Sequence, residues 1–203
     1  RDTTTGANNT AIGTDALLFN TTGYQNTAVG GSSLKANTEG YNNTAIGFNA
    51  LDTNTTGDMN IAVGYEALAA NTTADLNVAI GQQALTANTT GTLNVAVGPY
   101  TLDANTTGND NVAIGDRALS SNTTAINNTA VGAHALDDCS TGDHNTAVGH
   151  RALDANTTGT QNSAFGQNSG DAITTGNNNT TIGRYAGSDI TTGSNNVCLG
   201  NHA

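Results

Sequence analysis

One pattern of apolar and polar residues repeats along the whole chain with a period of 17 residues. In its clearest copy, residues 87–98, a polar turn signal (Asn88–Gly91) precedes a five-residue strand signal (Asn94–Gly98). Alternating β-branched residues fit an extended strand, and an Asn-Thr-Thr-Gly run is typical of a tight turn. The glycine that closes each strand signal recurs without insertion or deletion at Gly13, Gly30, Gly47, Gly64, Gly81, Gly98, Gly115, Gly132, Gly149, Gly166, Gly183 and Gly200. A fixed period over twelve copies predicts a solenoid, in which stacked repeats bury what one repeat cannot bury alone.

We number each repeat from this closing glycine, which is position 0. Position −4 is Asn in all twelve repeats, −2 is Ala in ten, and −3 and −1 are mostly β-branched. Position +4 is Leu in nine repeats, and +8 and +9 are mostly Thr. A constant spacing places equal residues above one another, so we expect parallel, in-register strands. The sequence therefore predicts an all-β protein, a parallel β-solenoid or β-roll of twelve 17-residue repeats, forming a single domain over residues 1–203.

Each coil is expected to hold two strands, one over positions −4 to 0 and a second short one over +3 to +6, as in residues 84–87. Side chains alternate along a strand, so −3 and −1 face one way while −4, −2 and 0 face the other. Asn94, Ala96, Val97 and Gly98 are the structural residues of this strand. We expect the Val97 row in the core and the alanine row at a close contact with another chain, packed side by side. The alternative is a monomeric solenoid with a plain Ala/Asn outer face.

The last repeats depart from the rule. Leu at +4 becomes Gly170 and Gly187, and Ile173 and Ile190 appear at +7, where Asn is usual. The apolar anchor moves three residues along the coil, which predicts a changed cross-section in about residues 167–203. Cys139 also replaces the usual Asn at +7.

The composition excludes an ordinary globule and several partners. Aromatic residues make up 4% and charged residues 10% of the chain, and Trp is absent, but disordered chains do not keep a fixed register of Ile, Val and Leu. The net charge is −11, from 16 acidic and 5 basic residues that are scattered along the chain. Nucleic acid and anionic membranes are bound through an excess of Lys and Arg, so we expect neither as a partner. The acidic surface keeps the chain soluble; capture of cations or of a cationic partner is the alternative.

The two cysteines do not predict a disulfide. Cys139 and Cys198 lie about 3.5 repeats apart, which is ~16 Å along the axis at about 4.8 Å per stacked strand, whereas a disulfide needs Cα atoms within about 7 Å. Cys198 stands in the alanine row and is expected to be a small buried residue.

The ends of the sequence suggest a piece of a longer chain. We find no signal peptide, transmembrane run or initiating methionine, and Arg1 begins in mid-repeat. Solenoid ends without caps are adhesive sheet edges. Either flanking domains cover them, or copies stack end to end into a homopolymer.

No motif predicts catalysis, a cofactor or a metal site, so we expect a protein that is not an enzyme. His134 and His150 lie one repeat apart at neighbouring positions, and we weigh a weak metal contact there against plain surface histidines. The glycine-rich turns are not phosphate loops, because no Gly-Lys-Ser/Thr follows them.

The Asn-Thr-Thr triplets read as glycosylation sequons at one repeat position. The candidates are Asn20, Asn54, Asn71, Asn88, Asn105, Asn122 and Asn156. A turn built from Asn and Thr for backbone reasons is the favoured explanation, because Asn also recurs at −4 without a sequon. Sequons also occur elsewhere, at Asn42 and Asn127.

The positions that vary most, +1/+2 and −6/−5, flank the strand. Variable corner residues on a fixed scaffold are where binding is expected, and exposed tyrosines suit stacking on sugars. The candidates for a binding surface are Tyr24, Tyr41, Tyr65, Tyr100 and Tyr185. Neutral drift on a solvated edge is the alternative.

The Asn-Val/Thr-Ala-Val/Ile-Gly core resembles the head repeats of trimeric autotransporter adhesins, and the longer unit is similar to repeats of bacterial surface and phage tail-fibre-like proteins. The resemblance covers essentially the whole chain. It implies a left-handed parallel β-roll, three chains around one axis, and a role in adhesion. The 17-residue period is longer than the commonest head repeat, and no coiled-coil stalk or membrane anchor is visible.

From these observations we expect a non-catalytic structural and adhesive fibre segment, located outside the cell, on a cell surface or on a virion. Its partners would be copies of itself, as a homotrimer or an end-to-end polymer, and a host-surface protein or glycan. The first alternative is a self-polymerising extracellular filament, glycan-coated if the sequons are used. A lesser alternative is an ice- or crystal-binding solenoid, since threonines at regular spacing can match a lattice.

Overall fold

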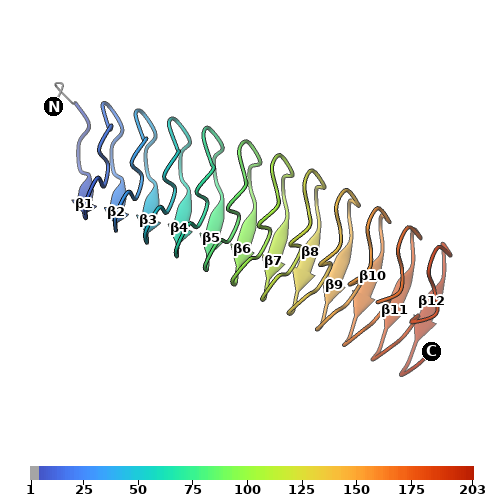
Figure 1. Cartoon of the computed structure of the whole chain (residues 1–203). Coiled ribbons are helices and arrows are strands. Elements are labelled where there is room, and N and C mark those ends of the chain that lie inside the picture. Colours follow the sequence, from blue (N-terminus) through green and yellow to red (C-terminus); the bar gives the residue numbers. More distant parts are fainter. Residues whose placement is uncertain (1–4) are drawn as a thin grey trace.

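The structure, a computed structural model, describes residues 5–203; Arg1 lies outside this part. Twelve three-residue strands form one parallel sheet in chain order (Figure 1). Their bounds are β1 (Thr10–Ile12), β2 (Thr27–Val29), β3 (Thr44–Ile46), β4 (Ile61–Val63), β5 (Val78–Ile80), β6 (Val95–Val97), β7 (Val112–Ile114), β8 (Thr129–Val131), β9 (Thr146–Val148), β10 (Ser163–Phe165), β11 (Thr180–Ile182) and β12 (Val197–Leu199). Each strand pairs with the strand 17 residues later, as Val95 with Val112. The predicted parallel β-solenoid is confirmed.

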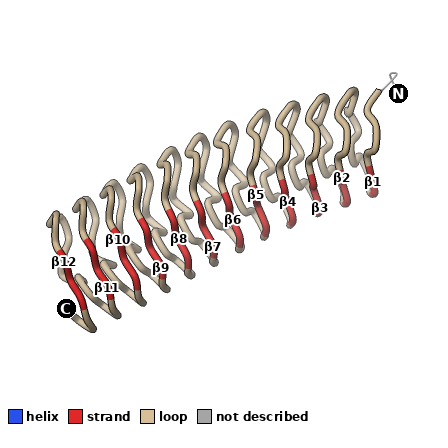
Figure 2. The backbone as a smooth tube through the Cα atoms, turned by 180° about the vertical axis from the view of Figure 1, so that it is seen from behind, coloured by secondary structure: helices blue, strands red, loops and turns tan. Residues whose placement is uncertain are grey.

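The molecule is a rod with β1 and β12 at opposite ends (Figure 1). Figure 2 shows the strands along one wall of the rod and the turns along the other. Within residues 5–203 no helix is long and apolar enough to cross a membrane.

The core lies between the strand wall and the turn wall of each coil. Ala96 of the strand and Leu102 at position +4 are fully buried, as are their counterparts in the central coils. The two positions meet across the coil: a Cβ added to Gly187, at +4, would lie 2.6 Å from Cγ2 of Thr181, at −2. A leucine reaching across so thin a coil leaves room only for alanine opposite it.

The predicted alternation of side chains is correct, but the assignment of inside and outside was wrong. Position −2 points into the coil, so Ala96 is buried by its own chain and is not available for contact with another. Positions −3 and −1 point outward: Val97 is half-buried and Ile114 is 40% exposed. The Val97 row is therefore not the core.

The predicted second strand is absent from residues 84–87, which form turns. Positions +2 and +4 adopt positive φ in every described coil, with φ 54° at Gln83 and 55° at Leu85. This left-handed backbone is incompatible with an extended strand. The coils are still joined here by hydrogen bonds, as from Leu85 N–H to the Thr101 carbonyl at 2.9 Å.

Two ladders of buried asparagines tie successive coils together. At −4, Asn94 Oδ1 accepts the backbone N–H of Asn111 at 3.1 Å, and its Nδ2 donates to the Gly108 carbonyl at 2.9 Å. At +7, Nδ2 of Asn105 donates to Oδ1 of Asn88 at 2.9 Å. The bonds of the −4 row run to the neighbouring coil and not to the residue's own turn, so this row joins the coils.

The closing glycine is required by a close approach between coils. Gly98 has φ +136°, and a Cβ there would lie 2.6 Å from the carbonyl oxygen of Gly115. No other residue fits this contact without moving the next coil.

The last coils keep the backbone of the earlier ones. Gly170 and Gly187 have φ 61° and 69°, close to the leucines that they replace, and the register continues through β12. Ile173 fills the core and is fully buried. The expected change of cross-section was wrong, because only the core side chain is exchanged.

Both cysteines are free, as expected. Cys139 is buried and its thiol donates to the Gly142 carbonyl at 3.3 Å. Cys198 is half-buried in the last strand.

Candidate functional surfaces

The outer face of the sheet carries two columns of exposed, mostly apolar side chains. Position −1 is apolar in every strand, and Ile46, Ile80 and Ile182 are 41%, 40% and 44% exposed. Position −3 adds Val, Ile, Thr and Ser. Because the strands pair in register, these side chains form one straight stripe along the rod, over the wall of strands in Figure 2. A continuous apolar stripe of this length is typical of an interaction surface.

The structure places the predicted glycosylation sites inside the coil. All of them occupy position +7, and every one except Asn20, in the first coil, is fully buried: Asn54, Asn71, Asn88, Asn105, Asn122 and Asn156. Their Nδ2 groups donate to the carbonyl at +10 of the same coil. A glycan attached to this nitrogen has no room in the folded coil at the six buried positions, where the burial supports the turn explanation. Asn42 and Asn127 are exposed.

The two threonines of the turn have different environments. At +8, the hydroxyl of Thr106 donates to the carbonyl of Thr123 at 3.0 Å, and this bond recurs from coil to coil. At +9, Thr107 is exposed. The regular outward hydroxyls thus form a single row at a corner and not a flat array.

The predicted tyrosines do not form one surface. Tyr24 and Tyr41 occupy −6, Tyr65 occupies +1, and Tyr100 and Tyr185 occupy +2, at different ends of the strand. The rings of Tyr24 and Tyr41 are parallel, with centroids 4.9 Å apart and planes at 2°. Each ring covers one face of the other, so a sugar has no access to the two faces between them.

The other aromatic rings also pack on neighbouring coils. Tyr65 stacks on Phe48 at 6.0 Å, and Phe48 in turn lies over Gly31, where an added Cβ would be 3.1 Å from its ring. Tyr185 stacks on His202 at 4.8 Å.

A polar surface that the sequence analysis missed is formed by contacts between the side chains at positions +2 and +5. In the coil after β8, His134 Nδ1 lies 2.7 Å from Asp137 Oδ2. The coil after β9 has Arg151 Nε 3.7 Å from Asp154 Oδ2, and the coil after β10 has a hydrogen bond from Asn168 to Asp171. In the sequence, these pairs could have been found from the three-residue spacing between their members, which repeats in successive coils.

The coils after β6 and β7 lack such a bridge and leave a small cleft instead. Tyr100, Asp103, Arg117 and Ser120 line a cavity of about 150 Å³. The Arg117 guanidinium lies 5.8 Å from the centroid of the Tyr100 ring, within cation–π range. Gln82 Nε2 donates to the Tyr100 hydroxyl at 2.8 Å.

Burial raises the pKa of three carboxyl groups at +5. For Asp103, burial is the largest cause, opposed by backbone hydrogen bonds and by Arg117. Burial likewise raises the pKa of Asp154 against the lowering effect of Arg151, and the pKa of Asp52 against that of Lys35. These groups are half-buried and close to the bodies of the coils.

The polar groups are not arranged as a catalytic triad. Ser120 donates to Asp137, and Asp137 contacts His134, so the carboxylate separates the hydroxyl from the imidazole. A nucleophilic serine needs the imidazole next to it. Within residues 5–203 no three His, Cys, Asp or Glu side chains are grouped to hold a metal. His134 and His150 lie edge to face with ring centroids 6.4 Å apart.

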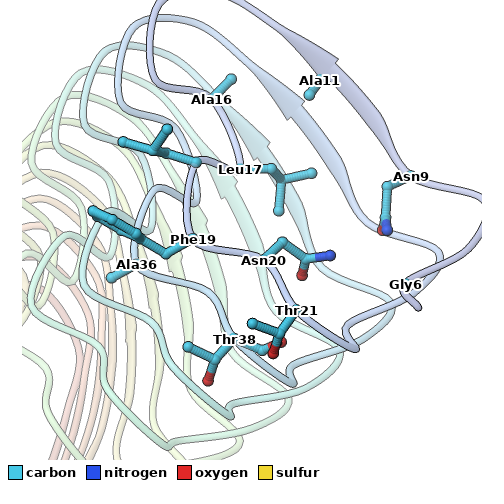
Figure 3. A pocket seen from close by; sticks show the side chains of 11 residues that line it. Gly6, Asn9, Ala11, Ala16, Leu17, Phe19, Asn20, Thr21, Ala36 and Thr38 are labelled. Atoms are coloured by element: carbon cyan, nitrogen blue, oxygen red, sulfur yellow. The ribbon is translucent and has the colours of Figure 1, made fainter. Parts of the chain in front are cut away.

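The larger cavity, about 830 Å³, lies at the first coil (Figure 3). Its lining includes Asn9, Ala11 and Leu17, which hold the repeat positions that are core in the following coils. Ala11 is exposed, whereas Ala28 in the next strand is fully buried. The cavity is thus the cross-section of the core seen from its end, and it has no chemistry of its own.

Comparison with known proteins shows no relative of this chain. No protein-family model matches the chain, and no curated protein or solved structure matches it either. The functional argument therefore depends on the surfaces described above.

Proposed function

We propose that this chain is a non-catalytic structural segment of an extracellular fibre. Copies associate side by side through the outer face of the sheet and present their corner residues for attachment. The observation that supports the proposal is the apolar row at −1, which runs through all twelve strands. It is flanked at −3 by Val or Ile in five strands and by Thr or Ser in the other seven.

The length of the stripe and its repeat favour further copies of this chain as its partner. Twelve strands at about 4.8 Å give a stripe ~58 Å long. With a width of about 12 Å, it offers ~700 Å² per chain, close to the ~800 Å² per partner of a standard protein interface. A partner that places one apolar side chain against each coil needs the same spacing along its own length. Further copies of this chain have that spacing.

The resemblance to adhesin head repeats supports a left-handed roll with three chains around one axis. Three sheet faces then enclose a common core of −1 residues such as Val97 and Ile114. The corners at +1/+2 and −6/−5 stay on the outside, where each binding group recurs in every chain. Weak binding by each group adds up to strong attachment through avidity.

The test is to place a charge on the stripe. In Val97→Asp/Ile114→Asp, a carboxylate buried between chains has no partner, so the assembly should dissociate. Thr107→Asp, at an exposed corner, is the control. We expect the double variant to have the mass of one chain with the circular dichroism of the wild type, while the control assembles normally. Equal masses for all three proteins would contradict the proposal.

A further inference from the structure

The cleft between the coils after β6 and β7 differs from the three coils that follow it in the contact between positions +2 and +5. In the three following coils, the side chain at +2 reaches the side chain at +5 and covers the groove between them. At the cleft, Tyr100 and Arg117 hold +2, and Asp103 and Ser120 hold +5. Arg117 has no carboxylate within ion-pairing distance in the part of the chain that the structure describes. The groove therefore stays open between these two coils.

The four groups around the cleft offer both donors and acceptors. Arg117 is exposed and carries N–H donors in a fixed planar fork. Asp103 is half-buried, and its carboxyl oxygens accept hydrogen bonds. The Tyr100 hydroxyl already accepts a bond from Gln82, so its own proton is free to donate. The Tyr100 ring lines the cleft beside the Arg117 guanidinium.

The charges around the cleft select a neutral ligand. Arg117 and Asp103 balance each other, so neither an anion nor a cation gains from the pair. Asp137, which accepts a bond from Ser120, adds negative charge at one side, and the chain as a whole carries −11. An anionic ligand is therefore disfavoured, and Arg117 disfavours a cationic one.

We propose that Tyr100, Asp103, Arg117 and Ser120 form a binding site for one neutral sugar residue. Adjacent hydroxyls of a sugar each donate and accept, which matches a guanidinium beside a carboxylate and a phenolic hydroxyl that is free to donate. The cleft is small, at about 150 Å³, so it holds part of one sugar residue and not a longer buried chain.

The site is shallow and small, so one sugar should bind weakly, with a Kd on the order of 1 mM. This inference rests on the adhesive role proposed above and names its ligand class. Three clefts in one assembly would reach glycans on a surface with far greater avidity.

The test measures binding of methyl glucoside, methyl galactoside and methyl mannoside to the full chain by ligand-observed NMR. Arg117→Gln removes the fork, and Ser120→Asp copies the Arg151–Asp154 arrangement and closes the cleft. Arg151→Gln is the matched control at +2 in a closed coil. We expect at least one neutral glycoside to bind, with at least about tenfold weaker binding in both cleft variants, since a hydrogen bond to a charged group is lost or occupied. The control should bind as the wild type does.

Three results would overturn the proposal. The first is no binding of any neutral glycoside by the wild-type chain. The second is unchanged binding in both cleft variants, which would place the sugar elsewhere. The third is tighter binding of glucuronate or of N-acetylneuraminate than of the neutral glycosides. Solution mass is recorded for each variant, so a lost sugar site in an assembled protein is distinguished from failure of the assembly.

Discussion

Ile173 lies over Gly170, with its Cδ1 3.1 Å from the position of a Cβ on that glycine. In nine earlier coils, Leu stands at the position of Gly170 and fills the core. The two arrangements are alternative ways to fill the core of a coil. Leucine fills the coil but holds positive φ, which costs roughly 1–2 kcal/mol for a residue with a Cβ, whereas glycine avoids that cost and isoleucine restores the volume.

This relationship predicts a compensating pair of substitutions in the coil after β8. Leu136→Gly alone should lower the free energy of unfolding by about 3–5 kcal/mol through the cavity it leaves. Cys139→Ile alone should overpack the core and cost about 1–3 kcal/mol. Together they should recover most of the loss, because they reproduce Gly170 and Ile173. Urea unfolding of the four proteins measures the coupling, and additive losses would show that the two side chains do not share one space.

The asparagine ladder predicts a large effect from a polar side chain. Asn94→Ala leaves the N–H of Asn111 buried without this partner and removes one of the two amide donors to the Gly108 carbonyl. It should cost about 2–4 kcal/mol. Thr107→Ala, at an exposed corner, should stay within about 0.5 kcal/mol of the wild type. Thermal or urea unfolding compares them. A cost at Asn94 as small as that at Thr107 would mean that the ladder does not hold the coils.

The buried thiol predicts a loss of stability in alkali. Burial raises the pKa of Cys139 from 9.0 to about 11. Below pH 9 the thiol is protonated in both states; between pH 9 and 11 the unfolded chain ionises first, so the free energy of unfolding falls. The total loss is about 2–3 kcal/mol, at about 1.4 kcal/mol per pKa unit.

Cys139→Asn is the matched control, since it restores the residue usual at +7. All other ionisable groups are the same in both proteins, so the difference between the two pH profiles isolates the thiol. Parallel profiles from pH 8 to pH 11 would contradict the burial of this group.

The burial of position +7 predicts which sequons can carry a glycan. When the chain is expressed in a glycosylating host, Asn88 and Asn105 should be unmodified in folded protein, while the exposed sequons Asn42 and Asn127 are accessible. Peptide mapping by mass spectrometry reads the occupancy of each site. Glycans on Asn88 or Asn105 in folded, protease-resistant protein would contradict the inward orientation of these side chains.

The period of the sequence was sufficient to predict the fold class, the parallel register and the alternation of side chains. It was not sufficient to decide which face is inside. That depends on the thickness of the coil, which is set by left-handed turns at residues such as Arg117 and Leu119. Neither arginine nor leucine favours positive φ, so the sequence does not indicate these turns. Val97 and Ala96 could therefore be assigned to opposite faces but not to the correct ones.

The surfaces were harder to predict than the fold. An Asn-Thr-Thr triplet looks the same whether its Asn points into a coil or out of it. The signal for burial lay in the exceptions, because Cys139 and Ile173 stand at the same position and are both apolar. The cleft at Tyr100 and Arg117 depends on side-chain contacts between coils, which one repeat does not reveal.

The most direct test of the proposed function is the mass of the unmodified chain in solution by sedimentation equilibrium. Side-by-side association through the outer face of the sheet predicts three times the chain mass of 20.3 kDa, independent of concentration over the measured range. A mass of one chain at every concentration would contradict it, and would leave the apolar stripe for another partner.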